Sequence, residues 1–299
     1  MEKTRKPTVS RLAKAINAGE FVVTSELNPP KGTDLSAIFD RAQALGGAVD
    51  AFNITDSHAA RMSACPLAAA HLLMDRGIEP IMQMTSRDRN RIALQGDLLG
   101  AATLGVSNIV FMGGDPPKVG DHPDAPGVYD ILSAQLLGVA SGLCNGVDME
   151  GNPLTGAPDL FLGAVVNPGA TDSATEIDKM KAKVDAGAQF LQSQAVYDAA
   201  SFEKFMNAAA GIDVKVLCGV ILLKSAKMAR YMNDNIPGID VPESLIAEFD
   251  DAQDKGAKSV EIAARVINAI KPMCHGVHIM PLGWEAKIPA WLEAIGKAD

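Results

Sequence analysis

Residues 79–117 read EPIMQMTSRDRNRIALQGDLLGAATLGVSNIVFMGGDPP and contain one complete strand–helix–strand unit. The short apolar runs Pro80–Met84 and Asn108–Met112 predict two strands. Between them, Asn90 can cap a helix whose apolar residues, spaced three and four apart, share one face. Strands joined by such a helix run parallel, so this unit predicts a parallel sheet.

The same alternation of short apolar runs and amphipathic helices continues along the whole chain. The runs do not alternate strictly with polar residues, which is typical of strands buried on both faces. Eight such steps in one series predict an α/β protein with a single (β/α)8 TIM barrel. No G-x-G-x-x-G follows the first strand, which argues against an open Rossmann sheet. The predicted strands are Phe21–Leu27, Ala51–Thr55, Pro80–Met84, Asn108–Met112, Phe161–Val166, Gln189–Gln192, Val214–Val220 and Gly276–Met280.

Helices are expected between these strands, and the whole chain of 299 residues is expected to be one barrel domain. Residues 1–18 are expected to form an N-terminal extension or helix. The later predicted helices are Tyr129–Leu143, Glu176–Ala186, Ser201–Ala210, Ala226–Asn233, an extra helix at Pro242–Gln253, and Val260–Ile270.

Composition limits the classes of function. The chain is 47% hydrophobic and 21% charged, with a formal net charge of −9, so nucleic acid is not an expected partner. The basic N-terminus lacks the apolar segment of a secretion signal, and no apolar run approaches the ~20 residues that span a bilayer. The four scattered cysteines are expected to be reduced. These features predict a cytoplasmic protein without a membrane span.

Polar residues follow most of the predicted strands at their carboxyl ends, where barrel enzymes keep their chemistry. Glu26 is the leading candidate, because no Lys or Arg lies close to it before Lys31. A desolvated carboxyl group there would hold its proton toward neutral pH and could act as a general acid. The alternative is a carboxylate that accepts backbone N–H groups. The other candidates are Thr55, Asp56, Gln83, Thr85, Asp115, Asn167, Gln192 and Gln194.

Two loop segments are also candidates for ligand binding. In Gly113–Pro117 the glycines permit close approach of a flat ligand to Asp115, although an Asp in a turn can also bond its own backbone. Residues Arg87–Arg91 place three arginines at a helix start and could bind phosphate or a polyglutamate tail, but a solvated, salt-bridged face is favoured. No His or Cys pair has metal-ligand spacing, so no metal site is predicted.

Taken in order from about Phe21 to Trp291, six segments resemble the methylenetetrahydrofolate reductase family. They are TSELNPPKG, FNITDS, EPIMQMTSRDRNRIALQGDLLGAATLG, NIVFMGGDPP, KVDAGAQFLQSQAVYD and GVHIMPLGWE. The resemblance implies a flavoprotein oxidoreductase of one-carbon metabolism and methionine biosynthesis. It implies that NAD(P)H reduces a flavin, with FAD favoured over FMN. The flavin then passes hydride to 5,10-methylenetetrahydrofolate, giving 5-methyltetrahydrofolate.

The resemblance also assigns roles to residues. It implies that Glu26 is the general acid, that Asp115 lies beside flavin and pterin, and that Gln194 contacts the folate. Catalysis is thus expected of Glu26 and Asp115, and substrate binding of these two with Gln194. The residues expected to bind the cofactor are Thr55, Gln83, Thr85, Gly114, Asp115, Tyr129, Asn167, Glu176 and Lys183.

The chain departs from better-known members of the family at several positions. Gln83 replaces a His, Gly113 replaces an Arg, and Asn167–Thr171 replaces a Y-P-E-x-H segment. Leu282–Glu285 replaces an Asn-Arg pair. These departures are similar to those of the branch found in acetogens and other one-carbon specialists, some of which work with partner subunits. The flavin's identity and the electron donor stay open.

Two other functions compete with the reductase. One is a methyltransferase on the same barrel that passes a methyl group from methyltetrahydrofolate to a corrinoid. The other is a subunit of a larger electron-transfer complex. Glu26 followed by Pro29 and Pro30, with GGDPP later, favours the reductase over the first. The presence of Glu26, Asp115 and Gln194 argues against a non-catalytic subunit. The sequence leaves open whether the protein forms a homo-oligomer or binds a partner subunit.

Overall fold

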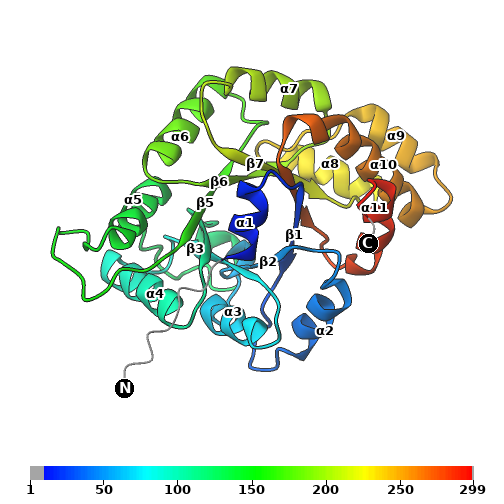
Figure 1. The fold of residues 1–299 in the computed structure, drawn as a ribbon. Coiled ribbons are helices and arrows are strands. Elements are labelled where there is room, and N and C mark those ends of the chain that lie inside the picture. Colours follow the sequence, from blue (N-terminus) through cyan, green and yellow to red (C-terminus); the bar gives the residue numbers. More distant parts are fainter. Residues whose placement is uncertain (1–9, 298–299) are drawn as a thin grey trace.

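The computed structural model describes residues 10–297. Its eight strands are parallel and lie in chain order, and β8 pairs with β1 to close a barrel. Figure 1 shows this ring with helices outside it. The predicted (β/α)8 barrel is therefore confirmed. The strands are β1 Val22–Leu27, β2 Ala51–Ile54, β3 Pro80–Thr85, β4 Asn108–Met112, β5 Phe161–Val166, β6 Phe190–Ala195, β7 Lys215–Ile221 and β8 Gly276–Met280.

The helices surround the barrel, except that α1 lies at the middle of the ring of strands in Figure 1. Within the expected N-terminal extension, α1 covers Arg11–Asn17, and residues 1–9 lie outside the described residues. The helices are α1, α2 Ser36–Leu45, α3 Pro66–Met74, α4 Arg91–Thr103, α5 Ser133–Cys144, α6 Ser173–Asp185, α7 Ala199–Ala208, α8 Ala226–Asn235, α9 Glu243–Asp251, α10 Lys255–Ile270 and α11 Ile288–Ala294.

Side-chain caps decide several helix starts. Asn90 caps α4 as predicted, accepting hydrogen bonds from the backbone N–H groups of the first turn. Helix α5 starts at Ser133 and not at the predicted Tyr129, because Tyr129 has φ +41°, which does not fit a right-handed helix. Helix α10 starts before the predicted Val260, because Asp254 accepts a hydrogen bond from the N–H of Ala257.

The barrel interior changes from apolar to polar along its axis. Residues two apart on a strand share a face, so Val22, Thr24 and Glu26 of β1 point the same way. The layer near the strand starts is apolar, and Leu12 and Ile16 of α1 pack against it. Farther along come the buried polar residues Thr24, Asn53, Gln83, Gln192 and His278. The apolar layer consists of Val22, Ala51, Ile81, Val110, Phe161, Phe190 and Leu217.

One glycine makes room for the largest side chains of this layer. The rings of Phe161 and Phe190 stack with centroids 4.8 Å apart. A Cβ atom at Gly163 would lie 2.4 Å from Cζ of Phe190, closer than carbon atoms can approach. Gly163 therefore allows β5 and β6 to pair while an aromatic pair fills the barrel.

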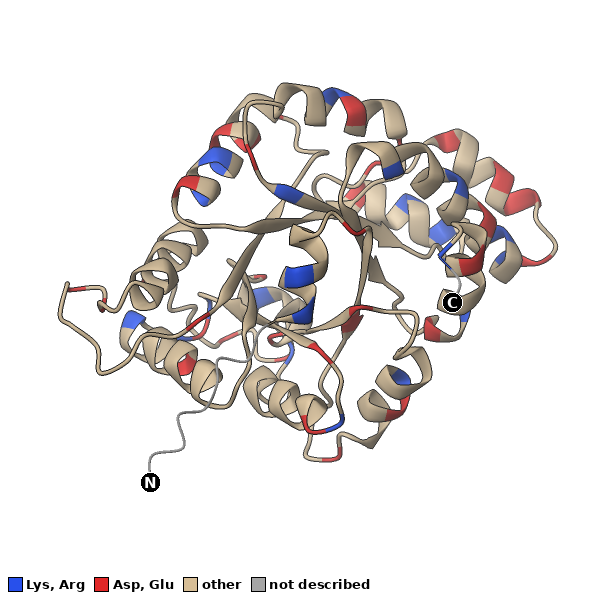
Figure 2. Cartoon of the chain, in the orientation of Figure 1, with Lys and Arg blue, Asp and Glu red and all other residues tan. Residues whose placement is uncertain are grey.

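The surface carries mixed charge. Acidic and basic residues are interspersed along the outer helices, and several acidic residues gather on α9 (Figure 2). The view shows no face on which basic residues dominate. Among residues 10–297, no helix combines the length and the apolar character that a bilayer crossing requires.

Replacing Gly163 by Ala tests the packing of the apolar layer. The added methyl group must displace Phe190, and overpacking of this kind lowers the free energy of unfolding by about 1–3 kcal/mol. Gly96→Ala is the matched control, because Gly96 is an exposed residue of α4 with open space around its Cβ position. The control should gain up to about 1 kcal/mol from helix propensity. Urea unfolding measures both, and equal stabilities would show that Gly163 is not needed for packing.

Candidate functional site

A cavity of about 490 Å³ opens at the carboxyl ends of the strands. Residues of β1, β3, β4, β5, β6 and β8 and the loop after β2 line it, so the barrel closure brings distant parts of the chain together. The lining residues are Glu26, His58, Gln83, Met112, Gly113, Gly114, Asp115, Val165, Val166, Asn167, Glu176, Lys183, Gln192, Ser193, Gln194, His278 and Met280.

The structure gathers the residues predicted to act in catalysis, substrate binding or cofactor binding around this cavity, except Thr55, Thr85 and Tyr129; the strand-end candidate Asp56 does not line it either. These three bond to the loops near it. The Thr55 hydroxyl donates to Asn28 Oδ1 at 2.8 Å, and the Thr85 hydroxyl donates to the Asp56 carboxylate at 2.9 Å. The Tyr129 hydroxyl donates to the Gly114 carbonyl at 3.4 Å. Their contacts shape the mouth, and ligand binding by them stays a prediction.

Glu26 lies beside an imidazole at the top of the barrel. Its side chain is 10% exposed, and Oε1 lies 3.5 Å from Nε2 of His278. The same oxygen accepts a hydrogen bond from Nε2 of Gln83 at 3.2 Å. On the other side of the ring, His278 Nδ1 lies 3.0 Å from the Thr24 hydroxyl. Glu26 is therefore held by side chains from two other strands, β3 and β8.

This contact continues into a buried network across the barrel. Gln192 Nε2 donates to the Thr24 hydroxyl at 3.3 Å and to Asn53 Oδ1 at 3.0 Å. Asn53 Nδ2 donates back to Gln192 Oε1 at 2.7 Å. Buried amides paired in this way lose little on burial, because their donors and acceptors are satisfied. The network fixes the floor of the cavity and the orientation of His278.

The predicted rise in the pKa of Glu26 is wrong. Burial is the largest single influence and raises this pKa. The hydrogen bond and charge of His278, the charge of His58 and the hydrogen bond from Gln83 together outweigh it, so the pKa of Glu26 is lowered. The side chains around Glu26 therefore favour its ionised form, with the imidazole of His278 beside it.

His58 stands on a strained loop. Ser57, Ala59 and Ala60 have φ of +50°, +53° and +55°, in the left-handed region that residues with a Cβ avoid. Such conformations cost of order 1–3 kcal/mol each and persist only where the surroundings hold them. Gly120 packs so closely on the Ala60 carbonyl that a Cβ atom there would overlap it. The loop is thus held in a shape that places His58 at the cavity rim.

Lys183 brings a buried positive charge to the opposite side of the cavity. Its Nζ donates to the Val165 carbonyl at 2.7 Å. Burial lowers the pKa of this ammonium, nearby Lys179 lowers it further, and Glu176 opposes both. Glu176 accepts a hydrogen bond from the Asn167 N–H at 2.9 Å, while Asn167 Oδ1 is buried without a partner. This edge of the cavity therefore contains an ammonium group and an amide oxygen without a partner.

Sequence reasoning missed His278 and His58. His278 lies in the inward register of β8, two residues before Met280, and that register was the available signal. The sequence holds no such signal for His58, because only the unusual backbone of its loop brings it to the rim. In the part of the chain that is described, no three His, Cys, Asp or Glu side chains come together in a way that could hold a metal ion.

Fold and site together define a TIM barrel with a polar ligand cavity at its mouth. The sequence model of the family described as methylenetetrahydrofolate reductase matches residues 11–296, and the chain therefore belongs to that family. The family resemblance of the six sequence segments is confirmed.

The individual relatives are distant. Methylenetetrahydrofolate reductase 2 of Schizosaccharomyces pombe is 22% identical over 240 residues, which are 73% of this chain and 36% of that protein. The 5,10-methylenetetrahydrofolate reductase of Salmonella typhimurium is 24% identical over 200 residues, 65% of this chain and 62% of that protein. The matches thus span less than two thirds of either relative.

A solved structure shares the fold. It is an uncharacterized protein from Clostridium thermocellum that binds two copies of 5-methyl-5,6,7,8-tetrahydrofolic acid. Its TM-score is 0.65 at 18% identity, and the match covers 95% of this chain and 97% of that chain. At this identity the likeness shows the fold alone.

Replacing His278 by Asn tests the electrostatics of the site. Without the imidazole, burial should dominate and raise the pKa of Glu26 above its ordinary value of 4.5. In the native protein the lowered pKa stabilises the fold above the unfolded pKa, and this is lost as pH falls through the folded value. In the variant the ionised carboxylate should instead destabilise the fold at neutral pH. Carboxyl ¹³C NMR, assigned with Glu26→Gln, measures the pKa, and an unchanged value would contradict the pairing.

Proposed function

We propose that this protein is a flavin-dependent methylenetetrahydrofolate reductase that interconverts 5,10-methylenetetrahydrofolate and 5-methyltetrahydrofolate, with NAD(P)H as the electron donor. The observation that carries the proposal is the pair of Glu26 and His278, which faces a cavity also lined by Asp115 and Gln194. Family membership supports it, and so does the binding of a methylated tetrahydrofolate by the Clostridium thermocellum protein of the same fold.

The cavity residues fit a flavin. Its volume lies within the ~300–1,000 Å³ that is common for small-molecule sites. At Gly113 a Cβ atom would meet nothing within 4 Å, so the glycine leaves the cavity wall open to the face of a ring. Lys183 offers N–H donors to a phosphate, and the unpartnered Asn167 Oδ1 can accept a hydrogen bond. FAD is the form that the family resemblance favours. When bound, a flavin supplies hydride transfer.

The residues of the chain supply proton transfer and orientation. Conversion of the methylene compound to an open iminium requires a proton on the folate amine nitrogen. The Glu26–His278 pair, whose Oε1 and Nε2 lie 3.5 Å apart, is the source of that proton, and Glu26 delivers it to the substrate. In the opposite direction the same pair accepts the proton. The exposed carboxylate of Asp115 and the amide of Gln194 orient the pterin in the cavity.

The first test is the colour and redox chemistry of the purified protein. We expect the visible absorbance of an oxidised flavin, its loss on anaerobic addition of NADH or NADPH, and its return on addition of 5,10-methylenetetrahydrofolate. Release of the cofactor by denaturation identifies it as FAD or FMN. A colourless protein that binds methyltetrahydrofolate and passes its methyl group to a corrinoid would overturn the proposal and favour the methyltransferase.

The second test separates the two half-reactions. Glu26→Gln removes the proton donor, so turnover of the folate should fall by the ~10²–10⁴ that general acid catalysis contributes. Flavin binding and flavin reduction by the nucleotide should change little. Glu203→Gln, on an exposed position of α7, is the matched control and should behave as wild type. Stopped-flow absorbance follows each half-reaction, and an equal loss in both would show that Glu26 has a structural role.

A further inference from the structure

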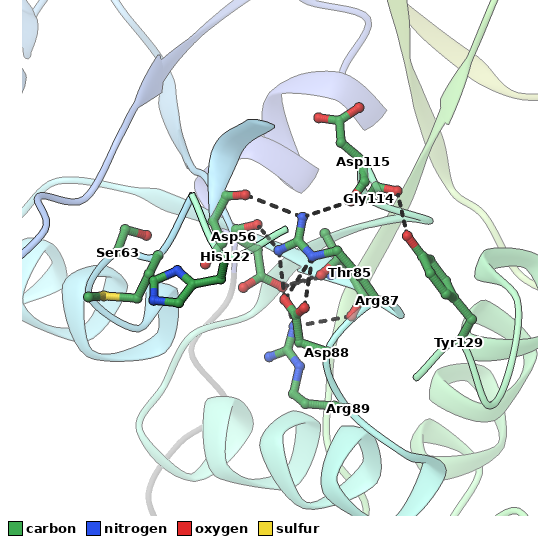
Figure 3. A network of polar contacts seen from close by, with 12 residues as sticks. Asp56, Ser63, Thr85, Arg87, Asp88, Arg89, Gly114, Asp115, His122 and Tyr129 are labelled. Carbon is green, nitrogen blue, oxygen red and sulfur yellow. Dashed lines mark hydrogen bonds and ion pairs between the residues drawn. The ribbon is translucent and has the colours of Figure 1, made fainter. Parts of the chain in front are cut away.

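Arg87 lies underneath the loops of the barrel mouth. It belongs to the segment of three arginines for which the sequence favoured a solvated face, and for Arg87 that prediction is wrong. Arg87 is only 2% exposed. Figure 3 shows the guanidinium surrounded by Asp56, Asp88 and the backbone around Gly114 and Asp115. The other two arginines pair with carboxylates, Arg91 with Asp130 and Arg89 with Asp56 and Asp97.

One guanidinium group joins two loops. Arg87 Nη1 donates to the Ser57 carbonyl and to the Asp115 carbonyl, each at 3.3 Å. Its Nη2 donates to the Asp56 carbonyl at 3.4 Å. Asp88 holds the group from the far side, accepting from Nε at 2.8 Å and from Nη2 at 2.6 Å. The bonds therefore connect the loop after β2 with the loop after β4.

The second loop sits directly on this arrangement. A Cβ atom at Gly114 would lie 3.0 Å from the Thr85 side chain and 3.3 Å from Cβ of Arg87, so the backbone is in contact with both. Thr85 is fixed in turn, because its N–H donates to the Asp56 carboxylate at 2.8 Å. Arg89 pairs with the same carboxylate. The side chains under Gly114 and Asp115 are thus themselves held by hydrogen bonds and an ion pair.

Both loops need such support. The loop after β2 carries the left-handed residues Ser57, Ala59 and Ala60, and Arg87 donates to the carbonyl of the first of them. Both His58 and Asp115 are exposed, so packing of their own side chains does little to fix them. A planar guanidinium with five N–H donors can reach two loops at once, whereas a lysine ammonium is a point charge on a flexible stem.

We propose that Arg87 is a positioning residue, which locks the loops after β2 and β4 together so that His58 and Asp115 face Glu26 across one cavity. Asp88 serves as its counter-ion and keeps the plane of the guanidinium fixed. The inference rests on the proposed function for its catalytic consequence, whereas the locking of the loops stands on the contacts of Arg87 alone.

The test compares Arg87→Lys and Arg87→Met with Arg265→Lys. Arg265 makes a bidentate pair with Glu248 on the outer helices, away from the cavity, so it controls for the loss of an arginine–carboxylate pair. Amide hydrogen exchange is measured on each folded protein. We expect faster exchange of residues 56–60 and 113–117 in both Arg87 variants, unchanged exchange in the barrel strands, and no change in the loops of the control.

Turnover provides the second readout. Misplacement of catalytic groups by about 1 Å can lower the rate ~10²-fold, and we expect a fall of this size in kcat for the folate reaction of Arg87→Lys. Because Lys keeps the charge, wild-type exchange and kcat in this variant would overturn the proposal, as would exchange that rises equally throughout the barrel. If Arg87→Met does not fold, Arg87→Lys decides. If the wild-type protein turns over no folate, the proposed function fails, while hydrogen exchange still decides whether Arg87 locks the loops.

Discussion

A buried carboxylate beside an imidazole is the constraint around which the top of this barrel is organised. An ionised carboxyl group that is only 10% exposed is unfavourable unless charge and hydrogen bonds compensate for its lost hydration. Gln83 and His278 provide that compensation from β3 and β8. His278 in turn needs a fixed orientation, which the Thr24 hydroxyl and the amides below it provide. The polar layer of the barrel interior therefore provides the contacts that a buried carboxylate at the position of Glu26 requires. The apolar layer beneath, covered by α1, keeps this network away from water at the other end of the barrel.

The loops at the mouth of the barrel also depend on buried polar contacts for their shape. Strands fix Glu26, Gln83 and His278, but His58 and Asp115 stand on loops that the strands alone do not define. One loop contains residues with left-handed backbone conformations, and in the other a glycine packs closely against Thr85. Such arrangements persist only where neighbouring groups hold them. Arg87 supplies restraint to both through backbone carbonyls. The chain thus uses buried ionic contacts twice, once for a group that faces the cavity and once beneath the loops that complete it.

The sequence predicted the architecture well and the electrostatics poorly, for a physical reason. Apolar runs and helix caps such as Asn90 are local signals, so the barrel and most strand positions followed from them. Because barrel enzymes keep their chemistry at the carboxyl ends of the strands, the sequence also pointed to Glu26, Gln83 and Gln194, which line one cavity. The pKa of Glu26 depends instead on a residue at the far end of the chain, which only barrel closure brings close. The burial of Arg87 was missed because the partners that draw it under the loops are backbone carbonyl groups, which a sequence does not reveal. The backbone of Tyr129, which delays the start of α5, likewise has no signature in residue type.

Gln83 shows how one departure from the wider family changes the proton chemistry of the site. The family resemblance predicts a His here, and a second imidazole beside Glu26 would give the cluster another group that gains and loses protons near neutral pH. An amide donates its hydrogen bond to Glu26 at every physiological pH and takes no proton away. Among the described residues, the imidazole that contacts Glu26 is then that of His278, while His58 at the rim lowers the pKa of Glu26. The substitution therefore leaves the carboxylate with one fewer ionisable neighbour and keeps a hydrogen bond that positions it.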